Sequence, residues 1–250
     1  MPREVESASY PIFLDHLAGF VQFSPETMVI AAGNAPEHSA IAHMISTPLA
    51  SRFKIIKVQP PTINDWRRWM DAHYNGNWDH RVYAFLLAFR DENYFMQPPK
   101  RRETLDPYPV PRTWTWLALE LHEGFDSPDD IDGYVGAEVG AKFRAFLKTR
   151  VNIDELVAAP RKFHELDFDA KYMAAIMLAS WLSKHAKTMQ KAFPLIDEMT
   201  SERTEFLVIT CTSMKRNKLL KFLEQLIKYQ PEYRKILSEV ALGLRDAIAV

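Results

Sequence analysis

The stretch "MVIAAGNAPEHS", from Met28 to Ser39, sets the first constraint on the fold. Its apolar run, "TMVIAA" at 27–32, lacks the apolar–polar alternation of a half-exposed strand. An unalternated run of this kind is typical of a strand that is buried on both faces of a sheet. The run ends at Gly33 and Asn34, which on their own indicate a turn, because both residue types favour turns.

The segments around this run predict a little more β structure. "SYPIFLDHLAG" predicts a short helix that starts near Ser9 and stops at Gly19, and "GFVQF" at 19–23 predicts a short strand. "KIIKV" at 54–58 is a second inner-strand candidate. Two or three strands form at best a marginal sheet. Further strands would therefore come from a partner, or this chain is the later part of something longer.

Beyond Pro61 the patterns predict helices. Capping residues are expected at Thr62 or Asn64 and at Ser127, and Gly124 is expected to end a helix. A proline-rich connection spans 91–111. The fold class predicted from these patterns is mainly α with a small β portion. The expected helices include 62–74, 79–89, 112–124, 127–150, 169–187, 216–229 and 231–247.

Composition narrows the function classes. The 250 residues carry a net charge of −1, which gives no global argument for nucleic acid or an anionic membrane as partner. The basic run "MKRNKLLK" at 214–221 is expected to be a solvated helix start. One cysteine, Cys211, excludes a disulfide within the chain. The first ten residues lack an apolar signal core, and no run approaches the roughly 18 apolar residues of a membrane span, so we expect a cytoplasmic protein.

The order of these motifs carries a family likeness. The succession of a strand, "AAGN", a loop, "PLASRF", a strand, "PP" and a set of helices resembles the second half of an AAA+ ATPase of the MoxR-like branch. The likeness covers roughly residues 1–150. It implies that 1–61 is the tail end of a P-loop α/β AAA+ core, that 62–150 is a helical lid, and that 151–250 is a helical C-terminal extension.

The resemblance implies roles for three residues. Asn34 would be sensor 1, a neutral amide that orients the attacking water or contacts the γ-phosphate. Arg52 would be the arginine finger, which reaches the site of a neighbouring subunit with its five fixed donors. Arg112, directly after Pro111, would be sensor 2 and would bind an ATP phosphate. A cation in the first turn of a helix opposes the helix dipole, and a bound phosphate would relieve that conflict.

Other parts of the family pattern are missing. A phosphate loop, GxxxxGK[ST], needs glycine directly before lysine, and none of the eight glycines precedes a lysine. The nearest match to the metal-binding Asp-Glu strand is Asp15-His16, and its place just before "GFV" favours ordinary helix residues over a degenerate metal site. We therefore expect this chain alone neither to bind nor to hydrolyse ATP appreciably, with ATP and Mg²⁺ expected only in the complete ATPase.

The leading hypothesis is that this chain is part of an ATPase that works in an oligomeric, chaperone-like ring and remodels a protein partner. Its expected partners are copies of itself in a homo-oligomeric ring, or a missing N-terminal half, together with the protein substrate. Neither nucleic acid nor a membrane is expected as a partner. The alternative is a non-catalytic helical protein-interaction module that retains an AAA+ remnant. A metal at Glu37, His38 and His43 is disfavoured, because their spacing lacks the H-E-x-x-H pattern. The tryptophan pairs 66/69 and 114/116 are expected in the lid core.

Overall fold

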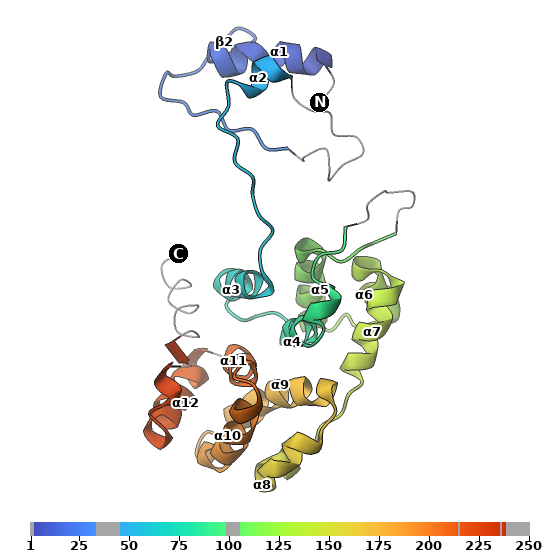
Figure 1. The fold of residues 1–250 in the computed structure, drawn as a ribbon, viewed down its shortest axis with the longest axis vertical. Helices are drawn as coiled ribbons and strands as arrows, with labels where there is room; N and C mark the ends of the chain where they lie inside the picture. The colour runs from blue at the N-terminus through green and yellow to red at the C-terminus, as the bar shows by residue number, and fades with distance from the viewer. Residues whose placement is uncertain (1–2, 34–45, 99–105, 215, 236, 239–250) are drawn as a thin grey trace. The chain divides into compact units, whose positions relative to one another are not determined.

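The computed structural model describes residues 3–33, 46–98, 106–214, 216–235 and 237–238 (Figure 1). The chain divides into two compact units. Unit 1 comprises residues 1–60 with 99–105, and unit 2 comprises residues 61–98 with 106–250. Each is described by itself.

Unit 1 holds four short elements among its described residues. Helix α1 (Arg3–Leu14) leads into an antiparallel pair of two-residue strands, β1 (Leu17–Ala18) and β2 (Val21–Gln22), and α2 (Thr47–Ala50) follows later. Leu17 pairs with Gln22 and Ala18 with Val21. The hairpin closes through Gly19, whose φ of 61° is in the left-handed region that glycine adopts without strain.

The two inner strands expected in unit 1 are not formed. Residues 27–32 and 54–58 have no regular secondary structure, and most of their apolar side chains are exposed, as in Ile30 (82%) and Val58 (90%). Both expectations were wrong for this chain by itself. The physical reason is that a strand needs a neighbour to satisfy its backbone groups, and the only strand pair in the described part of the chain is β1–β2.

The first helix also differs from its prediction. α1 starts at Arg3, ends at Leu14 and contains Pro11, which was expected only in a first turn. The helix ends within one turn of this proline. Asp15 and His16, expected to be helical, instead follow the helix, and His16 has a φ of 54° that turns the chain into the hairpin.

Unit 2 is helical throughout its regular structure. Its mainly α character confirms the coarse fold class predicted from the sequence. From residue 239 onward the predicted helix 231–247 lies outside the described residues. The elements are α3 (Ile63–Tyr74), α4 (His80–Ala88), η2 (Arg90–Glu92), α5 (Pro111–Glu123), α6 (Pro128–Val135), α7 (Ala137–Leu147), α8 (Ile153–Ala158), η3 (Pro160–Glu165), α9 (Phe168–Lys184), η4 (Met189–Ala192), α10 (Phe193–Glu202), α11 (Glu205–Thr212) and α12 (Arg216–Tyr229).

The predicted helix boundaries in unit 2 are set by local chemistry. Thr62 caps α3 through a reciprocal pair of bonds with Asp65, and Ser127 caps α6 in the same way with Asp130. Gly124 ends α5 with a φ of 95°. These three signals are confirmed.

One hydrophobic core runs through unit 2. Helix α4 is buried along most of its length, and Phe85 on it packs against Trp114, Phe143 and Phe146. α4 also packs against α9 and α11. Helices from the predicted lid and from the predicted extension therefore share this core, and the division near residue 150 stays a prediction from sequence.

Candidate functional site

The three residues with implied roles fall in different parts of the chain. Asn34 lies outside the described residues, as do Glu37, His38 and His43. Arg52 is exposed, two residues beyond α2 in unit 1, and Arg112 is exposed in the first turn of α5 in unit 2. Arg52 and Arg112 therefore belong to different units of the chain.

The start of α5 is fixed by its own sequence. Pro111 is the first helical residue, where a missing N–H costs nothing. The hydroxyl of Thr113 accepts a hydrogen bond from the Val110 backbone N–H at 3.0 Å. Trp114, one residue further, is buried and donates through Nε1 to the Tyr94 carbonyl at 2.8 Å. These contacts place the side chain of Arg112 on the outer surface of the first turn.

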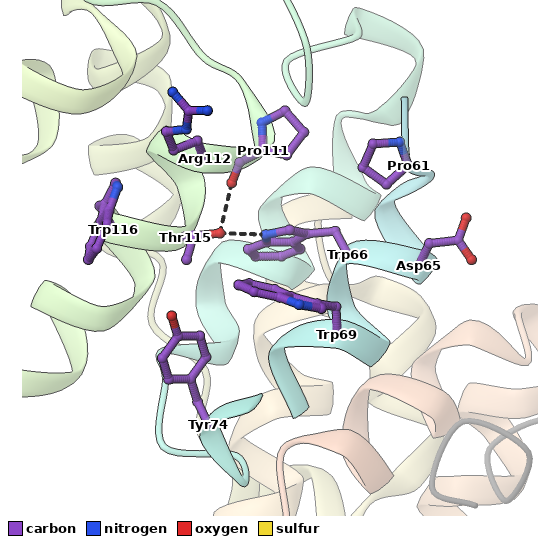
Figure 2. Close-up of a pocket in the computed structure, with 9 residues that line it drawn as sticks. All are labelled: Pro61, Asp65, Trp66, Trp69, Tyr74, Pro111, Arg112, Thr115 and Trp116. Atoms are coloured by element: carbon purple, nitrogen blue, oxygen red, sulfur yellow. Dashed lines mark hydrogen bonds between the residues drawn. The ribbon is translucent and has the colours of Figure 1, made fainter. Parts of the chain in front are cut away.

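A pocket with a volume of about 520 Å³ opens between α3 and α5, beside Arg112 (Figure 2). Most of its wall is aromatic or proline surface. This volume is within the range of about 300–1,000 Å³ that is usual for small-molecule sites. The residues that line it are Pro61, Asp65, Trp66, Trp69, Tyr74, Pro111, Arg112, Thr115 and Trp116.

The inner wall of the pocket is held by a buried hydrogen-bond chain. Trp66 Nε1 donates to Thr115 Oγ1 at 2.9 Å, and the same hydroxyl donates to the Pro111 carbonyl at 2.8 Å, as the dashed lines in Figure 2 show. Trp66 and Thr115 are only 3% and 6% exposed. The chain ties α3 to the first turn of α5, so it fixes the spacing of the two helices that form the pocket.

The outer wall is exposed aromatic surface. Trp69 is 43% exposed and Trp116 is 52% exposed. The Trp69 ring stacks on His73 with centroids 4.8 Å apart and meets Tyr74 edge-on at 5.8 Å. The pocket therefore presents rings whose faces are partly free to stack against a ligand.

The expectation for the tryptophan pairs is half right. Trp66 and Trp114 are in the core, as expected, whereas Trp69 and Trp116 are on the pocket surface. Residues two apart on a helix are separated by about 200°, so Trp114 and Trp116 cannot both face the core. That spacing was the signal that could have identified Trp116 from the sequence.

The two charged side chains at the pocket, Asp65 and Arg112, differ in whether they already have a partner. Hydrogen bonds from Thr62 hold the pKa of Asp65 below its usual range, and Arg68 pairs with the same carboxylate at 3.1 Å. The Arg112 guanidinium makes no hydrogen bond or ion pair with the side chains and backbone that the structure describes. The guanidinium of Arg112 is therefore available for an anionic group of a ligand.

A second cluster of titratable groups lies where α3 turns into α4. Asp71 pairs with Arg67 at 3.0 Å and accepts from Trp78 Nε1 at 3.0 Å. Burial raises the pKa of Asp71 to about 6 and lowers the pKa of His80 to about 4. None of these four residues lines the aromatic pocket. The cluster joins helix ends to each other, and we assign it a structural role.

Neither a metal-binding cluster nor a membrane-spanning helix occurs among the described residues. Among the residues that the structure describes, no group of three or more His, Cys, Asp or Glu side chains is arranged to hold a metal ion. Within the same residues, none of the helices has both the length and the apolar character needed to cross a bilayer.

Comparison with known proteins yields no assignment: no protein-family model, no curated protein and no solved structure matches this chain.

Proposed function

We propose that this chain is the C-terminal, sensor-and-lid portion of a MoxR-like AAA+ ATPase. In that role it couples ATP binding and hydrolysis in an oligomeric ring to the remodelling of a protein partner. The proposal starts from the sequence order of Asn34, Arg52 and Pro111–Arg112.

The observation that carries the proposal is the setting of Arg112. It is an exposed cation in the first turn of α5, where the helix dipole disfavours it, and it has no anionic partner among the described residues. A phosphate group there would satisfy both the guanidinium and the helix end. The adjoining aromatic wall suits the flat face of a nucleobase, because bases stack on tryptophan and tyrosine rings.

The residues present supply only part of a nucleotide site. Arg112 and the aromatic pocket fit one phosphate group and the base. The chain has no glycine–lysine pair, so it lacks the loop that would surround the phosphates. Hydrolysis consists largely of positioning and charge stabilisation. In the complete ATPase, the phosphate loop and Mg²⁺ would hold the nucleotide, Arg112 would contact it from the lid, and Asn34 and Arg52 would act as the resemblance implies.

The coding sequence that precedes Met1 tests this proposal. We expect it to encode, in frame or in an adjacent gene, a GxxxxGK[ST] loop and an apolar strand that ends in Asp-Glu. If neither segment is encoded there, the ATPase proposal loses its basis.

Calorimetric titration of MgATP into the purified chain gives a second test. We expect no saturable heat at nucleotide concentrations up to about 1 mM, because the contacts that contribute most to phosphate binding are missing. Micromolar binding of MgATP to the chain alone would contradict the expectation that a phosphate loop outside this chain is needed to hold the nucleotide.

The alternative function is a non-catalytic protein-interaction module, and one observation favours it. Tryptophan, tyrosine and arginine are the residue types that dominate binding hot spots, and Trp69, Tyr74, Trp116 and Arg112 share one pocket. Substitution separates the two functions. Partner binding that is lost in Trp116→Ala, in a chain that supports no ATP turnover when a phosphate-loop polypeptide is added, would favour the interaction module.

A further inference from the structure

Several lysines in and near η4 and α12 have no partner on their own chain. All are exposed, and none of their ammonium groups makes a hydrogen bond or an ion pair with a residue that the structure describes. Lys162 and Lys171 of the same unit, by contrast, each pair with a glutamate. We call the unpaired set the lysine surface; its members are Lys187, Lys191, Lys218, Lys221 and Lys228.

Helix α12 presents three of these lysines on one solvent-facing stripe. The residues that anchor α12 in the core are Leu219, Phe222 and Leu226. At 100° per residue, Lys218, Lys221 and Lys228 lie within an arc of about 80° on the helix, and Gln225 lies in the same arc. At a rise of 1.5 Å per residue, the stripe from Lys218 to Lys228 is about 15 Å long.

A hydrogen bond joins η4 to this stripe. Gln190 Nε2 donates to Gln225 Oε1 at 3.0 Å, and η4 packs against α12. Lys191 directly follows Gln190, so the bond brings this lysine to the edge of the stripe. Because the two glutamines are 35 residues apart, the basic run 214–221 read alone could not indicate that a second basic segment lies beside it.

Few carboxylates lie near the lysine surface. Residues 184–196 and 206–223 contain neither Asp nor Glu. Glu224 lies at the edge of the stripe, and Asp197 already accepts hydrogen bonds from the hydroxyls of Tyr229 and Tyr233. The positive charge is therefore not neutralised locally, and a basic stripe of this kind is the electrostatic footprint of a polyanion.

The residue types distinguish among polyanions. Protein interfaces are depleted of lysine and enriched in aromatic side chains and arginine, and a membrane-surface helix needs its apolar face for the bilayer, whereas that of α12 is in the core. Single-stranded nucleic acid is bound with aromatic rings that stack on its bases. The only Phe, Tyr or Trp within 184–192 and 216–228 is Phe222, which is buried.

We propose that the lysine surface binds the phosphodiester backbone of a nucleic-acid duplex without regard to its sequence. Phosphate contacts need only positive charge at suitable spacing, and they carry no base information. A stripe of about 15 Å runs beside about four base-pair steps of a duplex, at 3.4 Å per step along each strand.

Fluorescence anisotropy of labelled duplexes, titrated with the full chain, tests this proposal. The probes are a DNA duplex of about 20 base pairs, a second DNA duplex of unrelated sequence, and an RNA duplex with the first sequence. We expect a Kd of about 1–10 μM in about 50 mM NaCl, and a plot of log K against log salt with a slope of about −3 to −4. The two DNA probes should agree within about twofold. Tighter binding of the DNA or of the RNA duplex identifies the source of the phosphates. The measurement contains no ATP, so its outcome is independent of the proposed ATPase function.

Matched double variants locate the binding surface. Lys218→Gln with Lys221→Gln should weaken binding about tenfold or more and make the salt slope shallower by about 2, because two phosphate contacts are lost. Lys148→Gln with Arg150→Gln removes the same charge from two exposed residues that follow α7. Figure 1 shows α7 on the other side of unit 2 from α12, so we expect this control to leave binding unchanged.

Three results would overturn the proposal. One is the absence of any anisotropy change up to about 100 μM chain in about 50 mM NaCl. Another is an equal loss of binding in the two double variants, which would assign the effect to net charge instead of to the lysine surface. The third is tighter binding to polyglutamate, or to vesicles of equal parts phosphatidylcholine and phosphatidylserine, than to either kind of duplex.

Discussion

His80 and Asp71 are two neighbouring groups whose protonation affects stability in opposite directions. Burial lowers the pKa of His80 to about 4, so between pH 6.5 and 4 the unfolded chain binds the extra proton and folding weakens as pH falls. Burial raises the pKa of Asp71 to about 6. Just below that pH the folded chain therefore binds the extra proton, and folding strengthens as pH falls.

Removing one of the two groups should expose the effect of the other. Relative to the wild type, we expect the free energy of unfolding of His80→Gln to increase by about 1–2 kcal/mol between pH 6.5 and 4.5. Urea unfolding at several pH values measures this, with His73→Gln, an exposed histidine on α3, as the control. Identical pH profiles for His80→Gln and the wild type would show that His80 is not held neutral.

The hydroxyl of Thr115 controls the spacing of the pocket walls. Thr115→Val keeps the side-chain shape but leaves the buried Trp66 N–H without its acceptor. We expect a loss of about 1–3 kcal/mol in the free energy of unfolding. Thr115→Ser retains the hydroxyl and should lose about 1 kcal/mol or less. The bond is dispensable if urea midpoints show Val to be as stable as Ser.

At the level of helices and turns, the junction of α6 and α7 depends on Gly136. Its φ is 81°, and an added Cβ would lie 2.8 Å from the Pro107 carbonyl oxygen. We expect Gly136→Ala to cost about 1–3 kcal/mol, from backbone strain and this close contact.

Gly133 is the matched control for this prediction. It lies within α6 with no neighbour within 4 Å of an added Cβ. Gly133→Ala should therefore be neutral or stabilise by up to about 1 kcal/mol. Equal thermal midpoints for the two alanine variants would contradict the structural role assigned to Gly136.

The same level shows what sequence could and could not predict. Thr62, Ser127 and Gly124 were identified correctly because capping depends on residues three or four positions away. The strands at 27–32 and 54–58 were not, because strand formation depends on a partner that no local pattern supplies.

The candidate site, like the fold, could be predicted from the sequence only in part. The position of Arg112 at a helix start follows from Pro111. The pocket does not, since it requires the bond from Trp66 to Thr115, which are 49 residues apart. A residue's place on its own helix is local information, whereas the packing of α3 against α5 is not.

For the molecule as a whole, the two units differ in how much they bury. The contiguous hydrophobic core lies entirely in unit 2, and Leu49 is the only buried apolar residue among the described part of unit 1. Unit 1 therefore has little core of its own to hold two inner strands. Because unit 1 buries so little by itself, we expect the proposed ATPase activity to require a second polypeptide.

The control for Arg112 is present in the chain itself. Pro160–Arg161 repeats the Pro–Arg pair at the start of η3, and Arg161 is exposed but does not line the pocket. Arg161→Ala thus removes an arginine from a similar local setting, and we expect it to leave ATP turnover in the mixture described below unchanged.

The most direct measurement is ATP turnover by this chain mixed with the phosphate-loop polypeptide that we propose is encoded beside it. We predict that neither part hydrolyses ATP alone, that the mixture does, and that Arg112→Ala lowers turnover by about 10²-fold or more while Arg161→Ala does not. Turnover by the chain alone, or equal turnover of Arg112→Ala and wild-type mixtures, would contradict the assignment of this chain as the sensor-and-lid part of an ATPase.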